Sequence, residues 1–343
     1  ILIVRTDRIG DVVLTMPAIR ALRQAYPESR ISILVAPGTW DLVEGNKYID
    51  EVFVDDRQNA HKGVKGFIKL VRTLRRKRFD LAVIYHTKKR INLACFLAGI
   101  PHRVGYKNNK FGFLLNRPIF DTRHMGEKHE AQYCLDVLKF LKIESEDLTI
   151  DLPVKEQSRL WAEQFCKEHH ITDTDRLIAI HSGASDPAKR WPESRFAQLI
   201  DAFIAKYSAQ IVIIGSADAG GIAKNIISMV KGNVIDLTGQ TTVSQLTGLL
   251  KRCDLLVSND SGPVHIAAGV KTPVVSIFTR NQPGINPERW RPLGAKSRVV
   301  SVPPLQSDGI SFKKAGLVDD ARYMELIATD EVLEAVDALF KLC

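Results

Sequence analysis

Short apolar runs rich in β-branched residues alternate with amphipathic helical patterns along almost the whole chain. Such an alternation is typical of βαβ units built around a parallel sheet. The predicted strands cover residues 1–5, 31–36, 80–85, 103–105, 177–181, 210–215, 234–237, 254–258 and 273–278. The predicted helices cover residues 14–25, 64–77, 91–99, 193–206, 219–231, 243–251 and 264–269. Because the pattern stops and restarts near residue 153, we predict an α/β fold of two doubly wound domains.

The chain length of 343 residues also fits two domains that each bury a core of their own. We place the first domain over residues 1–153 and the second over 154–328. A closing amphipathic helix within 329–343, with Asp330 as its expected N-cap, is predicted to pack back across the domains. Hydrophobic residues make up 45% and charged residues 25% of the chain, a composition that excludes disorder and coiled coil.

No apolar run approaches the roughly 20 residues needed to cross a bilayer, and the chain opens on a strand-like ILIVR rather than a signal peptide. We therefore expect a soluble, cytosolic protein. The cysteines are odd in number and scattered, without a C-x-x-C pair, which argues against disulfides and structural zinc. We expect reduced thiols in or near the core at Cys95, Cys134, Cys166, Cys253 and Cys343. Without an H-E-x-x-H or clustered His/Asp pattern, we predict no metal site and no cofactor.

Positive charge is concentrated in one segment of the chain. Residues 57–128 hold 18 Lys or Arg against 3 acidic residues, although the net charge of the whole chain is only +9. A segment of one sign indicates an anionic partner. Nucleic acid, anionic lipid and phosphorylated glycolipid all fit this charge.

The basic segment predicts an acceptor surface on the first domain. In the helix over 64–77 we expect one apolar face of Phe67, Ile68, Val71 and Leu74, with cations on another face. A second group of cations follows the strand over 80–85, at the edge where ligands bind parallel sheets. The candidate acceptor-binding residues are Lys65, Lys69, Arg72, Lys88, Lys89 and Arg90. The alternative is a helix face that is merely solvated.

Four loops that follow predicted strands carry the candidate chemistry. In the first, over residues 6–11, Gly10 allows close approach and Asp11 stands where a helix begins, either as a functional carboxylate or only as an N-cap. This loop has no G-x-G-x-x-G, which disfavours a nicotinamide dinucleotide. The second loop, over 181–192, brings Lys189 and Arg190 to small residues whose N–H groups suit a phosphate. Its alternative role is a solvated turn ahead of a helix anchored by Trp191.

The third loop, over residues 258–265, predicts a helix start that can bind a diphosphate, with Ser261 as N-cap and Pro263 in the first turn. Asp260 would repel an anion, so we expect it to accept hydrogen bonds from sugar hydroxyls or to orient the loop. His265 either donates to the ligand or is structural. The fourth loop, over 215–221, is glycine-rich and gives a weaker indication of a nucleoside contact at Asp218.

Three segments resemble motifs of glycosyltransferase family nine, the lipopolysaccharide heptosyltransferases and related proteins. They are RIGDVVLTMP over 8–17, PAKRWP over 187–192 and SNDSGPVHIAAG over 258–269, and the resemblance covers nearly the whole chain. The middle segment is most similar to the branch that includes heptosyltransferase II. The resemblance implies a GT-B fold of two Rossmann-like domains with the active site in the interdomain cleft, an acceptor on the first domain and a nucleotide sugar on the second.

The resemblance also implies roles for individual residues. Asp11 matches the general base, and Lys189 matches a phosphate-contacting lysine that we count as catalytic. The implied donor-binding residues are Ser182, Gly183, Lys189, Arg190, Asp218, Asp260, Ser261, Gly262 and His265. Two departures concern the donor: relatives often have Gly-Pro-Thr where this chain reads Thr279-Arg280-Asn281, and often a glutamate where only Asp218 is nearby.

The implied activity is inverting transfer of heptose from an ADP-activated donor to a hydroxyl of the lipopolysaccharide inner core. The implied partners are the donor, an anionic glycolipid acceptor of the lipid A/Kdo type and the inner face of the inner membrane, where the enzyme would be peripheral. Alternatives are a family member with another sugar or acceptor, and a GT-B nucleotide-sugar epimerase. A nucleic-acid-binding protein is disfavoured because residues 57–90 offer only Phe67, Phe79 and Tyr85 for stacking.

Overall fold

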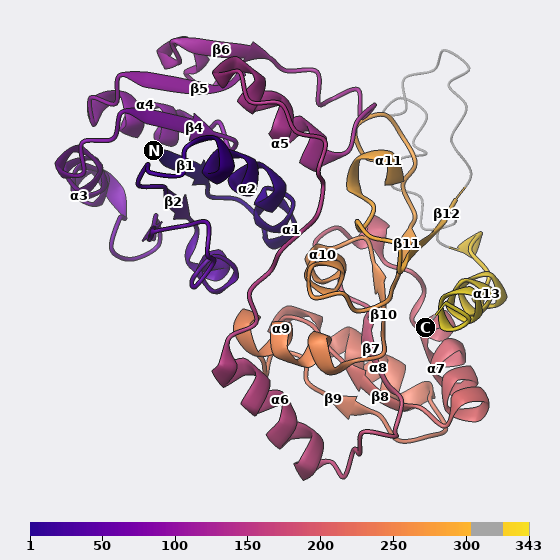
Figure 1. The fold of residues 1–343 in the computed structure, drawn as a ribbon. Helices are drawn as coiled ribbons and strands as arrows, with labels where there is room; N and C mark the ends of the chain where they lie inside the picture. Colours follow the sequence, from indigo (N-terminus) through magenta and orange to yellow (C-terminus); the bar gives the residue numbers. More distant parts are fainter. Residues whose placement is uncertain (303–324, 343) are drawn as a thin grey trace. The chain divides into compact units, whose positions relative to one another are not determined.

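The computed structural model describes residues 1–302 and 325–342 of the chain. These residues form two compact units, Ile1–Pro153 and Val154–Cys343, each with its own sheet and hydrophobic core (Figure 1). Each unit is described by itself below.

The first unit is built on a parallel sheet in the strand order β3-β2-β1-β4-β5-β6. Its strands are β1 (Leu2–Arg5), β2 (Ser32–Val35), β3 (Glu51–Val54), β4 (Leu81–Ile84), β5 (His102–Lys107) and β6 (Arg117–Phe120). β1 and β2 are apolar over most of their length and fully buried, as expected of strands covered on both faces. The strands β2 and β3 are added on one side of β1, and β4, β5 and β6 are added on its other side. The reversal point of the strand order therefore lies between the neighbouring strands β1 and β4, and ligands of such sheets bind there, outside the carboxyl ends of the strands.

Two helix pairs cover this sheet. α2 packs against α5, and α3 packs against α4. The helices are α1 (Ile9–Val13), α2 (Met16–Ala25), α3 (Gly63–Arg76), α4 (Lys89–Leu97) and α5 (Glu130–Leu138), with short 3-10 turns η1 (Pro37–Leu42), η2 (Gly112–Leu114) and η3 (Lys139–Leu141). Leu70 and Leu74 of α3 pack into the core with Leu2 and Val4 of β1. The same core cluster includes Ala82 and Ile84 of β4, so β1, β4 and α3 share one packed interior.

The second unit repeats the same topology, in the order β12-β11-β10-β7-β8-β9. Its strands are β7 (Leu177–His181), β8 (Gln210–Ile213), β9 (Ile235–Asp236), β10 (Leu255–Asn259), β11 (Val274–Phe278) and β12 (Ser297–Ser301). The first strand of this unit, β7, pairs with β10, so the reversal point lies between them. The prediction of two doubly wound α/β domains is confirmed.

Helices on the second sheet position its loops. They are α6 (Glu156–Glu168), α7 (Glu193–Tyr207), α8 (Gly220–Met229), α9 (Val243–Arg252), α10 (Gly262–Gly269), α11 (Pro287–Trp290) and α13 (Thr329–Phe340), with 3-10 turns η4 (Pro187–Lys189) and η5 (Ala217–Ala219). α6 crosses α9 so closely that a Cβ on Gly248 would stand 2.3 Å from the carbonyl oxygen of Ser158. α13 packs on α7, β11 and β12.

Three local predictions need correction. The helix expected over 14–25 is split into α1 and α2, because Pro17 has no N–H to continue a helix and instead fits the start of a new one. Asp330 is not the N-cap of the closing helix: Ala328 takes that position, and its N–H donates to Glu331 Oε1 at 2.9 Å. β3, β6, β12, α5 and α6 were absent from the predicted elements.

The four cysteines within the described residues, Cys95, Cys134, Cys166 and Cys253, are buried free thiols. Cys343 lies outside the described residues. In the described ranges 1–302 and 325–342, no helix has the length and apolar character to span a bilayer.

Candidate active site

The turn after β1 is built on a buried arginine. Arg5, the last residue of β1, is 1% exposed, and Asp11 lies in the first turn of α1. The Arg5 guanidinium donates from Nε to the main-chain carbonyl oxygen of Asp11 at 3.1 Å and from Nη2 to its Oδ1 at 2.9 Å. The Asp11 side chain remains 19% exposed. Arg8 occupies the N-cap of α1, so the interpretation of Asp11 as only an N-cap is wrong.

Two further carboxylates share Arg5. Its Nη2 also donates to Glu130 Oε1 at 2.9 Å, and its Nε lies 3.3 Å from Asp7 Oδ1, an ion-pair distance without hydrogen-bond alignment. Glu130, at the start of α5, is 2% exposed. The sequence analysis identified neither Arg5 nor Glu130 as a site residue. Arg5 could have been found, because a charged residue at the end of an otherwise apolar strand indicates a functional or paired group.

The environment makes Asp11 a stronger base than an ordinary carboxylate. Burial raises its pKa to about 6, the neighbouring Asp7 and Glu130 add to the increase, and Arg5 partly opposes it. Burial also raises the pKa of Asp7. A carboxylate with a pKa near 6 is largely ionised at neutral pH yet binds a proton more tightly than an exposed aspartate.

His86 faces this turn from the other side of the reversal point. It follows β4, and its Nδ1 lies 2.9 Å from Thr6 Oγ1 in a hydrogen bond. Burial, with Lys88 and Arg5 nearby, lowers the pKa of His86 to about 4, so the ring is neutral at neutral pH. His86 was not among the predicted site residues.

A cavity of about 370 Å³ opens beside Thr6 at the carboxyl ends of the strands. Its wall includes three of the predicted acceptor residues, Lys88, Lys89 and Arg90. Arg90 has a supporting role in the fold: it donates from Nε and Nη2 to the two Asp55 oxygens, both at 3.0 Å. Lys88 and Lys89 are exposed at the start of α4 and leave the cavity positively charged.

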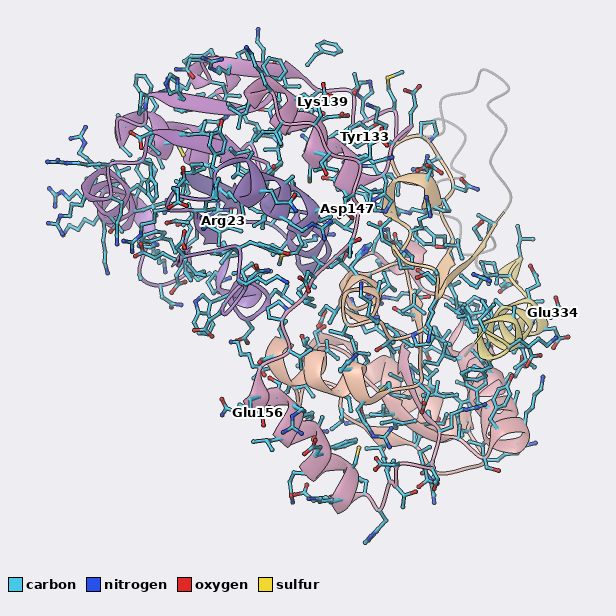
Figure 2. The ribbon with its side chains drawn as sticks, in the orientation of Figure 1. Arg23, Tyr133, Lys139, Asp147, Glu156 and Glu334 are labelled. Carbon is cyan, nitrogen blue, oxygen red and sulfur yellow. The ribbon has the colours of Figure 1, made fainter. Side chains whose placement is uncertain are left out.

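The other predicted acceptor residues, Lys65, Lys69 and Arg72, do not line this cavity. They lie on the exposed face of α3, whose side chains project away from the sheet (Figure 2). The predicted apolar face of α3 also needs correction, because Ile68 is 41% exposed. Gly66 and Leu70 are buried in its place, with Leu74, and Phe67 and Val71 pack beside them.

In the second unit, the loops after β7 and β10 meet through an ion pair. Lys189 Nζ, in η4, contacts Asp260 Oδ2, and both side chains are largely buried. An ammonium group has three donors, so one bond to Asp260 leaves donors for a ligand. The ion pair with Asp260 fixes the direction of the lysine side chain, a contact that the sequence analysis did not anticipate. Arg190 is turned inward, donating from Nε and Nη2 to the Ala184 carbonyl oxygen at 3.0 and 2.9 Å.

The loop after β11 fixes η4 from its other side. Arg280 Nη2 forms an ion pair with Asp186 Oδ2, and Asp186 Oδ1 accepts from the Ala188 N–H at 3.1 Å, capping η4. Thr279 Oγ1 donates to the Ala188 carbonyl oxygen at 3.0 Å. The departure from the family pattern at residues 279–281 therefore supplies contacts that hold the turn carrying Lys189.

Two residues missed by sequence reasoning connect the loops. His181, at the end of β7, shares its Nδ1 with Ser258 Oγ at 3.2 Å and Ser261 Oγ at 3.1 Å, and burial lowers its pKa to about 4. The amide of Asn259 accepts from the Trp191 N–H at 3.0 Å and donates to the Ser182 carbonyl oxygen at 2.7 Å. Asn259 is fully buried, so this amide fixes the spacing between the two loops.

The start of α10 remains open to a ligand. Ser261 is the N-cap residue, but its hydroxyl makes no capping hydrogen bond because it is directed to His181. The adjacent Gly262 begins the helix, where N–H groups and the helix dipole favour an anion. His265, one turn into α10, is 3% exposed.

The fourth loop adjoins the second. A Cβ on Gly183 would stand 3.2 Å from the Ala219 side chain of η5, so a bulkier residue there would press on that turn. Asp218, also in η5, is exposed, and a hydrogen bond from Ser216 lowers its pKa. In the described residues, no group of three or more His, Cys, Asp or Glu is arranged to hold a metal ion.

Comparison with known proteins gives a consistent family assignment. The model of glycosyltransferase family 9 (heptosyltransferase) matches residues 67–315. The lipopolysaccharide heptosyltransferase 2 of Escherichia coli K12 is 26% identical over 349 residues, covering 99% of this chain and 98% of that protein.

Solved structures agree in fold. A glycosyl transferase family 9 structure from Veillonella parvula DSM 2008 has a TM-score of 0.89 at 25% identity, covering 100% of this chain and 97% of that one. The E. coli ADP-heptose LPS heptosyltransferase II has a TM-score of 0.77 at 23% identity, covering 98% and 97%. The GT-B fold predicted from sequence is confirmed, and since the family match spans most of its length, this chain belongs to glycosyltransferase family 9 (heptosyltransferase) and is a glycosyltransferase.

Proposed function

We propose that this enzyme transfers a heptose from ADP-heptose to a hydroxyl group of the lipopolysaccharide inner core, with inversion at the anomeric carbon. The full-length similarity to a lipopolysaccharide heptosyltransferase 2 supports the donor and acceptor classes. The single observation that carries the mechanism is Asp11, a carboxylate held by Arg5 with its pKa raised to about 6.

Asp11 is the proposed general base. Arg5 holds Oδ1, and Oδ2 makes no hydrogen bond to the described part of the chain. This second oxygen takes the proton of the acceptor hydroxyl while the hydroxyl oxygen attacks the anomeric carbon. The bond from that carbon to the diphosphate breaks with its electron pair going to the diphosphate, so the products are the inverted glycoside and ADP. The fixed guanidinium keeps the base from rotating away from the acceptor.

The diphosphate gains negative charge as its bond breaks. Lys189 and the N-terminus of α10 at Gly262 are the proposed partners of that charge, with Ser182 and Gly183 contributing backbone groups beside them. Groups held in place before the reaction stabilise the developing charge without reorganising. The Asp260 carboxylate and the Asn259 amide supply this fixation.

The acceptor is the proposed occupant of the positively charged cavity beside Thr6. Lys88 and Lys89 present ammonium groups there, which suit the carboxylate or phosphate groups of an anionic glycolipid. The enzyme would then work as a peripheral protein on the inner face of the inner membrane. Asp218 and His265 are proposed to belong to the donor site on the sequence resemblance alone.

The test is product analysis with a panel of nucleotide sugars. We expect ADP-heptose to raise the melting temperature more than UDP- or GDP-sugars do, because a ligand bound only to the native state stabilises it. With a deacylated core acceptor present, ADP and a glycosylated product should form together. An isomerised sugar without ADP release would identify an epimerase instead, and turnover only with another nucleotide sugar would refute the heptose donor.

A further inference from the structure

The exposed face of α3 carries positive charge that no acidic side chain within the described residues pairs with. Six cations lie on it or at its start: Lys62, Lys65, Lys69, Arg72, Arg75 and Arg76. α3 contains no acidic residue, and within the described residues none of the six forms an ion pair. Like charges three and four residues apart repel along a helix, so this face disfavours the helix unless an anionic surface lies against it.

Exposed aliphatic side chains interrupt the same face. Val64 is 75% exposed and Ile68 is 41% exposed, and the two are four residues apart, one above the other on the helix. Lys65 and Lys69 flank them at the same spacing. Aliphatic and cationic side chains thus occur together on the exposed part of α3.

The face continues onto the neighbouring elements. Arg75 Nη2 donates to the Leu97 carbonyl oxygen at 2.8 Å, joining the ends of α3 and α4. Phe96 and Leu97, at the end of α4, are 46% and 40% exposed, and the Arg103 guanidinium lies over the Phe96 ring. η2 packs on α4 and exposes Phe113. We call this set the α3–α4 face: apolar Val64, Ile68, Phe96, Leu97 and Phe113 among the six cations.

We propose that the α3–α4 face docks on the surface of an anionic lipid bilayer, with its apolar side chains at the level of the acyl chains and its cations among the lipid phosphates. Cations beside exposed aliphatic and aromatic groups are the pattern by which helices lie in a membrane interface. This inference rests on the proposed function, because an enzyme whose acceptor is a membrane glycolipid must work at the membrane surface. It assigns Lys65, Lys69 and Arg72 to the bilayer, while Lys88 and Lys89 line the acceptor cavity.

The α3 part of this face, which carries its six cations, suits a nucleic acid less well than a bilayer. Single-stranded binding uses exposed aromatic rings between the cations. On α3 the exposed apolar residues are aliphatic, and the Phe67 ring is half-buried beneath the Arg90 guanidinium at 5.0 Å. Val64 and Ile68 can enter lipid but cannot stack on a base.

The test is vesicle co-sedimentation without donor or acceptor, so that its outcome does not depend on the proposed reaction. Vesicles of phosphatidylcholine alone are compared with vesicles that also contain phosphatidylglycerol. We expect binding only to the anionic vesicles, weakened by salt. Neutralising Lys65→Gln, Lys69→Gln and Arg72→Gln together should reduce the partition coefficient roughly 100-fold, at about fivefold per cation.

A second variant separates lipid binding from general attraction to polyanions. Val64→Ser with Ile68→Ser should weaken vesicle binding roughly tenfold, while leaving affinity for a single-stranded oligonucleotide and turnover of a deacylated acceptor in solution unchanged. The matched control is Lys167→Gln, Lys224→Gln and Lys231→Gln, three exposed lysines of the second unit, which should bind vesicles like the parent.

Several results would overturn the proposal. The first is that the parent protein does not bind anionic vesicles. The second is that the control triple variant loses as much vesicle binding as the α3 triple variant. The third is that vesicle binding is unchanged when both aliphatic side chains are removed. In the last case the face would be a polyanion site, and tighter binding of the oligonucleotide would indicate nucleic acid.

Discussion

The guanidinium of Arg5 holds Asp11 at two points, through Nε to its main-chain carbonyl oxygen and through Nη2 to its side-chain Oδ1. Backbone and carboxylate are thus fixed by one planar group at the end of β1. A bidentate arginine restrains both position and orientation, which a single ammonium group would not do. The carboxylate that we propose as the general base is therefore already held in position in the structure without substrate.

Asp11→Asn should abolish most of the turnover. The amide keeps the shape and still accepts from Arg5, but it cannot take a proton, so we expect a loss of at least about 100-fold in kcat. Donor affinity, measured by titration with ADP, should stay close to that of the parent because all the donor-binding groups that we propose belong to the second unit. Near-normal kcat in this variant would rule out Asp11 as the base.

The same substitution should make the protein more stable. The pKa of Asp11 is higher in the folded chain, about 6, than in the unfolded chain, so ionisation disfavours folding as pH rises through that range. Asp11→Asn removes this cost, and we expect a gain of about 1–2 kcal/mol in the free energy of unfolding near pH 7.5. The gain should vanish below about pH 3, where the carboxyl group is protonated in both the folded and the unfolded state. Urea unfolding at both pH values measures it, and a destabilised variant would indicate a purely structural carboxylate.

The pH dependence of kcat/KM should show Asp11 directly. Activity requires the ionised form, so it should fall as pH drops through about 6. Asp7→Asn removes a neighbouring negative charge and should move this acid limb to lower pH, with little change in rate at pH 8. Asp7 is suited to the test because its Oδ1 makes no hydrogen bond within the described residues. Asp147→Asn, at an exposed surface position labelled in Figure 2, serves as the control whose profile should not move.

Lys189→Met should reduce kcat about 100-fold or more, the usual cost of removing one donor to a developing charge. Asp260→Asn should have a smaller effect, since the lysine keeps its charge but loses its orientation. Lys189→Arg should restore part of the rate. Steady-state kinetics with Lys224→Met, an exposed lysine of α8, as the unaffected control would test this. Equal losses in Lys189→Met and the control would remove Lys189 from the mechanism.

Arg280 and Asp186 should act as a unit. Removing either one frees η4, so Arg280→Ala and Asp186→Ala should each raise the donor KM, and the double variant should be little worse than either single one. We expect a coupling energy of about 1 kcal/mol from the double-mutant cycle. Arg280→Lys should recover part of the affinity. Fully additive effects would show that the ion pair does not position Lys189.

The parts of the structure that could be predicted are those whose pattern of apolar and polar residues lies within one short segment of the chain. Buried strands such as β1 and β10 are short apolar runs, and Asp11 and Asp260 stand shortly after them in the sequence. β6, in contrast, reads RPIF and is an exposed edge strand containing Pro118, so it lacks the alternation and burial of the central strands. α6 buries only four of its thirteen residues, and one of them is the polar Ser158, so its apolar face is narrow.

The contacts that tune the site could not be predicted from one sequence. Arg5 and Glu130 are 125 residues apart, and His181 and Ser261 are 80 apart. Such pairs meet only because the sheet places β1 beside the start of α5 and β7 beside β10. The raised pKa of Asp11 follows from this tertiary burial and is invisible in the RIGD motif that contains it.

Each of the two sheets has its own reversal point and its own packed interior. The turn proposed to accept the proton is built entirely from residues of the first, and the lysine and helix start proposed for the diphosphate entirely from the second. We therefore predict that substitutions confined to the second unit alter which sugar nucleotide is used without changing the proton transfer in the first. A chimera in which residues 154–343 are replaced by those of a relative should use the donor of that relative. The acid limb of its pH profile of kcat/KM should stay that of the parent protein.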